Sequence, residues 1–211
     1  MEKRLTLSMP SFGRPQRTIR AIEHIANQNV NDWEALVTGD GCPVMEDFIN
    51  SGTFIDMIKD CQRRGNNLIV TNHKKNRGHH GFALTNEHIQ KANGRWFMFY
   101  ANDDVILENH FQNYLSEVEN TNLDFAFFNS WVNCNNMPRM SQLKYGSIGH
   151  SELIIRTSFL KKMPVHDHKY GHDWQLIKDM LAETTKYKKA TSGHQTYWVM
   201  SVPNNQEKNI D

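Results

Sequence analysis

The sequence predicts an α/β fold in which helices cover both faces of a mostly parallel sheet. Between residues 4 and 105, short runs rich in β-branched and aromatic residues alternate four times with segments whose apolar residues recur at helical spacing. That alternation is typical of parallel strands joined by crossover helices. A chain of 211 residues is long enough to bury a sizeable core. Because we find no repeat and no linker, we expect a single domain over residues 1–211.

The first two strands of this pattern each end in a polar turn. Residues 5–9 form the first expected strand, and a loop containing proline and glycine closes it. Isoleucines at helical spacing mark the helix that follows, to about Gln28. Residues 33–38 form the second expected strand, which ends in an Asp-Gly turn. Apolar residues then predict helical packing up to about Arg64, with a break near Gly52.

The next two strands lead to an acidic turn. Residues 67–71 predict the third strand, and a polar, cationic loop follows it. Residues 82–92 predict a helix that Gly94 is expected to end. Residues 95–100 predict the fourth strand, which stops at Asn102-Asp103-Asp104. Turn chemistry alone explains such a run, but four polar strand ends at one edge of a parallel sheet favour a ligand site.

The second half of the chain is less regular. Its expected elements are a helix at 107–118, a strand at 123–128, a loop or ribbon at 131–145, a strand at 150–155, a short helix at 157–162, a helix at 173–183, a strand at 195–202 and a loose tail at 203–211. Because no linker separates these segments from the alternating half, we expect them to belong to the same domain.

Composition and charge exclude several classes of protein. Lysine and arginine number 24 and aspartate and glutamate 23, which gives a net charge of +1 with neutral histidine. No global field therefore demands a nucleic-acid or membrane partner. The three cysteines are far apart and form no metal-binding spacing, which fits a reducing, intracellular setting. We find no signal peptide and no membrane span, and we expect a cytoplasmic protein without stable membrane insertion.

Several short segments occur in an order that is more specific than any one of them. They are the Pro-Ser-aromatic loop at 10–12, the strand ending in Asp40-Gly41, the Asn86-x-x-Ile89-x-x-Ala92-x-Gly94 helix, the Asn102-Asp103-Asp104 run, Gly149-His150-Ser151 and His172-Asp173-Trp174. Over residues 4–180 the chain resembles the family 2 glycosyltransferases of the GT-A fold. The resemblance implies a nucleotide-sugar-binding half at about 4–105 and an acceptor-side half at about 106–202.

The resemblance implies a donor site at the first strand ends. Asp40 would face the nucleobase, where its carboxylate can accept the imide N–H of uracil and so favour a UDP-sugar. An arginine in the cationic loop would neutralise the diphosphate with directed N–H groups. The donor-binding residues expected on this basis are Pro10, Ser11, Phe12, Arg14, Asp40, Arg77, Asn102 and Asp103. The alternatives are an ordinary Asp-Gly turn at Asp40, packing at Phe12 and a solvated charge at Arg77.

The resemblance also implies a metal site. Asp104, with Asp103 in support, would bind Mn²⁺ or Mg²⁺, and His194 would add a ligand near the end of the chain. The ion neutralises the nucleoside diphosphate as it leaves. Ala101 stands where the family often has an aspartate, so Asp104 carries most of the expected metal binding.

Asp173 is the expected catalytic base. It would remove a proton from an acceptor hydroxyl during attack on the anomeric carbon, which inverts the anomeric configuration. The alternative is a helix N-cap. A zinc site at His166, His168 and His172 lacks supporting ligands, and histidines that stack on a sugar or cap a loop are the preferred interpretation.

The acceptor is expected to be a saccharide. Local basic clusters leave a minority hypothesis, a hydroxylated base in DNA. Two other classes remain open, a nucleotidyltransferase and a non-catalytic nucleotide- or glycan-binding module. The loop at 10–15 lacks the glycine-rich, basic character that nucleotidyltransferases usually have there.

Overall fold

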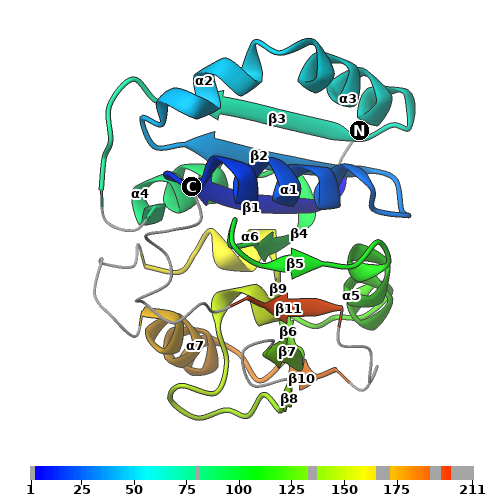
Figure 1. Ribbon diagram of the computed structural model, residues 1–211. Coiled ribbons are helices and arrows are strands. Elements are labelled where there is room, and N and C mark those ends of the chain that lie inside the picture. The colour runs from blue at the N-terminus through cyan, green and yellow to red at the C-terminus, as the bar shows by residue number, and fades with distance from the viewer. Residues whose placement is uncertain (1–2, 79–80, 133–136, 165–171, 191–195, 201–211) are drawn as a thin grey trace.

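A seven-stranded sheet runs through the molecule, with a smaller sheet beside it (Figure 1). The computed structural model describes residues 3–78, 81–132, 137–164, 172–190 and 196–200. His166, His168 and His194 lie outside these ranges.

The large sheet is mostly parallel, as predicted. Its strands in spatial order are β10 (Tyr187–Lys189), β6 (Phe125–Phe127), β9 (Leu153–Arg156), β4 (Gly94–Phe99), β1 (Lys3–Ser11), β2 (Trp33–Gly39) and β3 (Asn67–Asn72). Only β9 runs against its neighbours, β4 and β6; the other pairs are parallel. The carboxyl ends of β1, β2, β3 and β4 therefore lie at one edge, where ligands bind in open α/β sheets.

Helices cover both faces of this sheet. They are α1 (Pro15–Ala26), α2 (Pro43–Ile49), α3 (Gly52–Arg63), α4 (Phe82–Lys91), α5 (His110–Val118), α6 (Thr157–Leu160) and α7 (His172–Glu183). Side chains alternate between the faces along β4, as the period of a strand requires. Trp96 and Met98 join a core with α1, α3 and α5, whereas Phe97 and Phe99 join a second core with α6 and α7.

A buried polar network attaches α4 to the sheet. His88 of α4 lies with its Nδ1 2.8 Å from the Ser8 hydroxyl and its Nε2 2.8 Å from the Thr38 hydroxyl. Burial lowers the pKa of His88 to about 4. Glu34 of β2 accepts hydrogen bonds from the Thr6 hydroxyl at 2.6 Å and from the Asn93 N–H at 2.6 Å. This network attaches α4 to β1 and β2 near their carboxyl ends, which form part of the expected site.

The smaller sheet closes one side of the same edge. Its strands in order are β5 (Val105–Ile106), β11 (Tyr197–Val199), β7 (Ser130–Val132) and β8 (Met137–Arg139). The ribbon expected at 131–145 is the antiparallel pair of β7 and β8, and the last expected strand is β11. Neither β10 nor β5 was predicted, because strands of two or three residues carry too little periodicity to detect. The pairing of β5, β11, β7 and β8 into a second sheet was not predicted either, because it depends on contacts between segments that are far apart in sequence.

Two boundaries differ in an informative way from the sequence expectation. The break expected near Gly52 lies at Ser51, which caps α3 by accepting a hydrogen bond from the Phe54 N–H at 3.4 Å. Gly94 does not end α4, which stops at Lys91; it begins β4. A Cβ at Gly94 would overlap the backbone of Leu5 and Thr6. Gly94 is therefore required by the close approach of β1.

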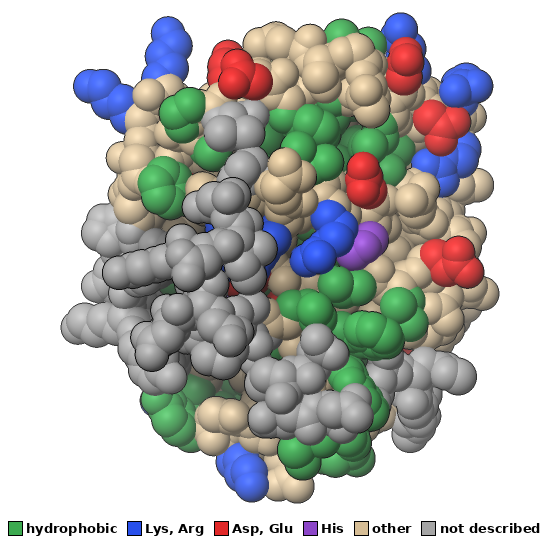
Figure 2. All heavy atoms as spheres, in the orientation of Figure 1, with side chains coloured by type: hydrophobic (Ala, Val, Ile, Leu, Met, Phe, Trp, Pro, Cys, Tyr) green, Lys and Arg blue, Asp and Glu red, His purple; other side chains and the backbone are tan. Residues whose placement is uncertain are grey.

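The described surface carries mixed charge. On the face shown in Figure 2, basic and acidic side chains are interspersed around the rim, in keeping with the net charge of +1. Within the described ranges, no helix combines the length and apolar character that a bilayer crossing requires.

Candidate active site

Two adjoining pockets open at the carboxyl edge of the parallel strands. We call the first the donor pocket; it encloses about 660 Å³ and is lined by Pro10, Ser11, Phe12, Gly13, Arg14, Asp40, Asn76, Gly78, Gly81 and Asn102. We call the second the reaction cleft; it encloses about 420 Å³. Both are lined by Pro10 and Asn102, so they lie side by side at this edge. Six of the eight residues expected to bind a donor line the first pocket.

Asp40 shapes the donor pocket by holding the loop after β3. Its buried carboxylate accepts hydrogen bonds from the N–H groups of Arg77 at 2.8 Å and Gly78 at 3.1 Å. Gly41 has a φ of +72°, and a Cβ there would lie 2.5 Å from the Asn76 nitrogen. The Asp-Gly turn therefore brings two loops into contact. Each carboxylate oxygen has a second lone pair, so Asp40 can still accept from a ligand.

The side chain of Arg77 turns away from the donor pocket. Its guanidinium pairs with Glu87 of α4, and this hydrogen bond lowers the pKa of Glu87. His73 lies 3.6 Å and Lys91 3.8 Å from the same carboxylate. The structure thus places the backbone of Arg77 at the donor pocket and its charge on α4.

Asn102 and Asp103 are fixed by residues of the first loop and of α1. The Asn102 side-chain N–H donates to the hydroxyls of Ser11 at 3.1 Å and Thr18 at 2.9 Å. Asp103 forms an ion pair with Arg14. The Arg14 backbone has a φ of +52°, which is uncommon for a residue with a side chain. The carboxylate of Asp103 therefore already has a cation beside the donor pocket.

Asp104 is buried in the wall of the reaction cleft. Its Oδ2 accepts a hydrogen bond from the Tyr197 hydroxyl, and its Oδ1 accepts one from the Met200 N–H at 2.8 Å. Burial raises the pKa of Asp104 to about 6 despite these bonds. No salt bridge to Asp104 occurs among the described residues. A buried carboxylate facing a polar cleft without a paired cation fits a divalent ion, whose preferred ligands are oxygens.

The lining of the cleft also includes Arg139, which is partly exposed and forms an ion pair with Glu152. Glu152 is fully buried and accepts hydrogen bonds from Nε of Arg139 at 2.8 Å, from the Gly149 N–H at 2.6 Å and from the Ser130 hydroxyl. Glu152 thus orients a guanidinium that can bind an anionic or hydroxyl group of a ligand.

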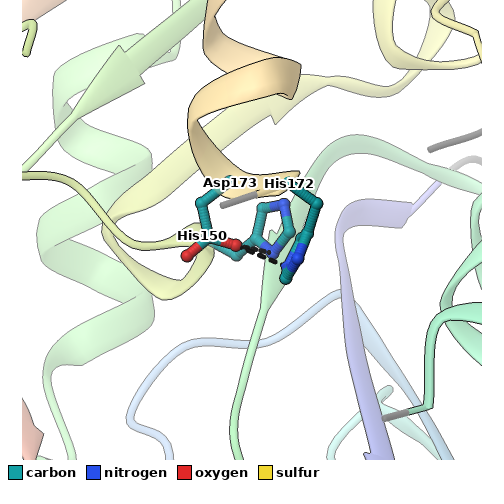
Figure 3. A group of neighbouring side chains, drawn as sticks. All are labelled: His150, His172 and Asp173. Carbon is teal, nitrogen blue, oxygen red and sulfur yellow. Dashed lines mark ion pairs between the residues drawn. The ribbon is translucent and has the colours of Figure 1, made fainter. Parts of the chain in front are cut away.

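Asp173 lies at the start of α7 between two histidines (Figure 3). Its Oδ1 is 2.7 Å from His150 Nδ1 and 2.6 Å from His172 Nε2. Burial alone would raise the pKa of Asp173, but the hydrogen bonds and charges of His150 and His172 outweigh it and hold that pKa well below its usual range. All three residues line the cleft. Asp173 is therefore an ionised acceptor whose orientation the two rings fix.

Several of these residues escaped the sequence prediction. Arg139 lies in a segment rich in Asn, Met and Pro that gave no periodic signal, and Tyr197 lies in a three-residue strand. The partnership of His150 with Asp173 joins positions that are far apart in the sequence, which a single sequence does not reveal. The Gly149-His150-Ser151 segment, matched to the acceptor side, was the one available signal for it.

The order of the strands and the edge formed by their carboxyl ends are those of a GT-A fold. The profile of glycosyl transferase family 2 matches residues 6–183. The chain belongs to that family, which confirms the resemblance seen in the sequence.

The curated relative that it matches is an uncharacterized glycosyltransferase of Rickettsia bellii. The two are 26% identical over 125 residues, which is 59% of this chain and 16% of that protein. The chain thus spans a small part of this relative's length.

Solved structures share the fold at low identity. S. aureus TarS 1–349 superimposes with a TM-score of 0.71 at 14% identity, over 93% of this chain and 60% of that one. Its complex with UDP-GlcNAc gives a TM-score of 0.69 at 14% identity, over 95% of this chain and 59% of that one. The mannosyltransferase PcManGT from Pyrobaculum calidifontis, in complex with GDP-Man and Mn²⁺, superimposes with a TM-score of 0.64 at 11% identity. The match covers 98% of this chain and 59% of that one. This chain spans about three fifths of the length of each.

Proposed function

We propose that this chain transfers a sugar from a UDP-sugar to an acceptor hydroxyl with inversion at the anomeric carbon. The observation that supports this most strongly is that the two pockets adjoin and share Pro10 and Asn102 in their walls. Asp40 and Phe12 line one, Asp104 and Asp173 line the other, and Asn102 lies between them. The nucleotide would occupy the donor pocket, and the sugar would extend into the reaction cleft.

Asp104 would hold the divalent ion, Mn²⁺ or Mg²⁺, and His194 remains a proposed further ligand. When bound, the ion neutralises the departing diphosphate. Arg14 and Asp103 would hold the donor beside it. Asp103 would act through its pair with Arg14 in this proposal, because its carboxylate already has that partner. Arg77 would contribute its backbone to the donor pocket, while its charge stays paired with Glu87 of α4.

Asp173 would take the proton of the acceptor hydroxyl. His150 and His172 both contact Oδ1. We therefore assign Oδ2 as the atom that accepts the proton of the acceptor hydroxyl. The two histidines stabilise the ionised carboxylate before the reaction, and they can share the proton afterwards. One carboxylate in this position suits a single displacement, which inverts the anomeric centre.

The donor is proposed to be UDP-linked because a carboxylate at Asp40 complements the uracil imide. TarS in complex with UDP-GlcNAc and PcManGT in complex with GDP-Man show that the fold accommodates both carriers. The acceptor is proposed to be a saccharide, and a hydroxylated DNA base remains the minority alternative.

The test is a thermal-shift screen of UDP-GlcNAc, UDP-glucose and GDP-mannose, each with and without Mn²⁺, followed by transfer assays with the stabilising donor. Saccharide acceptors and an oligonucleotide carrying a hydroxymethylated base are offered in parallel. We expect stabilisation by UDP-sugars that increases with Mn²⁺. Stabilisation by GDP-mannose alone would reject the donor assignment, and no shift with any nucleotide sugar would reject the function.

A further inference from the structure

Three metal-ligating atoms converge on one wall of the reaction cleft. His150 Nδ1, His172 Nε2 and a carboxylate oxygen of Asp173 all lie within 4.8 Å of one another. Figure 3 shows the three side chains pointing toward one another, His150 from the turn before β9 and the other two from α7. Two imidazoles and one carboxylate form a ligand set that zinc enzymes use.

Aromatic packing holds both rings in place. Phe99 stacks on His150, with ring centroids 4.7 Å apart, and the Phe82 ring meets His172 edge-on at 3.9 Å. The side chains of His150 and His172 are 17% and 19% exposed, so each ring is mostly enclosed but still reaches the cleft. An ion could therefore enter from the cleft and find three ligands already oriented, and no other described His, Cys, Asp or Glu joins the group.

For an ion to bind, the two nitrogen-to-oxygen contacts must lengthen, and the two histidine nitrogens, which lie within 4.8 Å of each other, must approach by at most about 1.4 Å. Two ligands about 2.1 Å from a tetrahedral ion are separated by about 3.4 Å. The nitrogen-to-oxygen distances of 2.6 and 2.7 Å are those of hydrogen bonds. An ion would replace the shared protons and push each nitrogen and the oxygen apart by less than about 1 Å. Each displaced proton would move to the other ring nitrogen or to solvent.

We propose that His150, His172 and Asp173 form a binding site for Zn²⁺ or a similar nitrogen-preferring transition metal, and that the bound ion blocks the catalytic carboxylate. The inhibitory part of this inference rests on the proposed role of Asp173 as base. An ion coordinated by Oδ1 of Asp173 withdraws charge from the whole carboxylate, so Oδ2 becomes a weaker base toward the acceptor proton. The ion also occupies the part of the cleft that the acceptor hydroxyl must reach.

The two metal sites of the cleft would then select different ions. Asp104 offers oxygen and faces the expected diphosphate, which suits Mg²⁺ or Mn²⁺. The site at Asp173 offers two imidazole nitrogens, which favour Zn²⁺ over Mg²⁺. Zn²⁺ is therefore expected to inhibit a reaction that Mn²⁺ supports, and an excess of Mn²⁺ is needed to keep Asp104 occupied by Mn²⁺ while Zn²⁺ fills the second site.

The binding test is calorimetric titration of the full chain with ZnCl₂ and, separately, visible absorption with CoCl₂, both without nucleotide sugar. We expect one Zn²⁺ per chain at this site, and at least about tenfold weaker affinity in His172→Ala and His150→Ala. His172→Gln, which keeps a donor toward Asp173, serves as a second variant if His172→Ala fails to fold. The matched control is His73→Gln, which removes a histidine beside Glu87 and should leave the affinity unchanged.

The inhibition test measures turnover with Mn²⁺ held in excess while Zn²⁺ is added. We expect inhibition at the Zn²⁺ concentrations that fill the site, reversed by chelation and renewed Mn²⁺. Unchanged Zn²⁺ affinity in both His150 and His172 variants would overturn the site. Zn²⁺ binding that needs both histidines but leaves turnover intact would overturn the inhibitory role and the assignment of Asp173 as base. Absence of transferase activity would count against the proposed function, and the calorimetric result would still decide the site.

Discussion

The hydroxyl of Tyr197 donates a hydrogen bond to Oδ2 of Asp104, across 93 positions of sequence. The bond joins β11 of the small sheet to the turn after β4 of the large one. Burial raises the pKa of Tyr197 as well as that of Asp104. Both groups line the reaction cleft, so the small sheet completes the wall in which the expected metal ligand lies.

Asp104→Asn should remove metal-dependent activity while preserving the fold. The amide oxygen of the introduced asparagine can still accept a hydrogen bond from Tyr197 or Met200, but the side chain lacks the charge that attracts a cation. We expect kcat/KM to fall by at least about 100-fold, which is about 2.7 kcal/mol of lost transition-state stabilisation. Transfer assays over a Mn²⁺ titration measure this loss.

The neighbouring aspartate provides a comparison for this variant. Asp103 pairs with Arg14, so Asp103→Asn should weaken donor binding while leaving a response to Mn²⁺. A circular-dichroism melt of both variants checks the fold. If Asp104→Asn kept both full activity and the Mn²⁺ response, Asp104 would not be the metal ligand.

Asp173→Asn should stop turnover without preventing donor binding. The introduced amide can still contact His150 and His172, but it cannot accept a proton at neutral pH. General bases typically contribute about 10²- to 10⁴-fold to the rate, so we expect kcat to fall by at least about 100-fold. The affinity for the UDP-sugar should change by less than about threefold.

Asp179→Asn is the matched control for this substitution. Asp179 lies on the same helix, where it accepts a hydrogen bond from Gln175 at 2.7 Å, and the variant should retain turnover. Calorimetry with UDP-sugar and a coupled UDP-release assay separate binding from chemistry. Turnover by Asp173→Asn near the unmodified level would remove Asp173 as base.

The buried histidines predict how stability responds to acid. The folded-state pKa of His88 is about 4, against 6.5 in an exposed chain. As the pH falls below about 6.5, the unfolded chain gains a proton at His88 and the folded chain does not, until about pH 4. The stability contributed by neutral burial is thus complete above about pH 6.5 and is lost as the pH falls toward about 4. The loss is on the order of 3 kcal/mol.

Urea unfolding between about pH 7 and pH 4.5 measures this dependence. Burial lowers the pKa of His110 to about 3, so it adds a loss of the same sign. His88→Gln should reduce the pH slope, and His73→Gln, whose charge is the smallest of the causes that lower the His88 pKa, should change the slope much less. A free energy of unfolding that stays constant down to about pH 5 would contradict the neutral burial of both rings.

A strand can be predicted from the sequence when it is long enough for its pattern of apolar residues to be recognised. The strands β1 to β4 are six residues or longer, and each alternates with an amphipathic helix, so the parallel sheet was predictable. The strands of the small sheet have two or three residues. They exist because β11 pairs with β5 and β7, partners that are far away in sequence and are set only by tertiary packing.

Some residues of the candidate site could also be predicted from the sequence and others could not. Asp40, Asn102 and Asp104 follow long parallel strands, so their shared edge could be inferred from the βα alternation. The direction of the Arg77 side chain could not, because Glu87 competes for the guanidinium from a neighbouring helix. The pairing of His150 with Asp173 also depends on where β9 inserts between β4 and β6. That insertion is antiparallel, and the alternating pattern gave no indication of it.

Gly94 has no space for a side chain and Gly52 has open space, so alanine substitutions at the two positions test the packing at Gly94. A Cβ at Gly94 would overlap the backbone of Leu5 and Thr6, and neither can withdraw because β1 pairs with β2 and β4. Gly94→Ala should therefore destabilise the fold by about 2 kcal/mol or more. A Cβ at Gly52, in the first turn of α3, meets nothing within 4 Å, so Gly52→Ala should be neutral or stabilising by up to about 1 kcal/mol. Urea unfolding of both variants measures the contrast, and equal stabilities would show that β1 does not need a glycine opposite it.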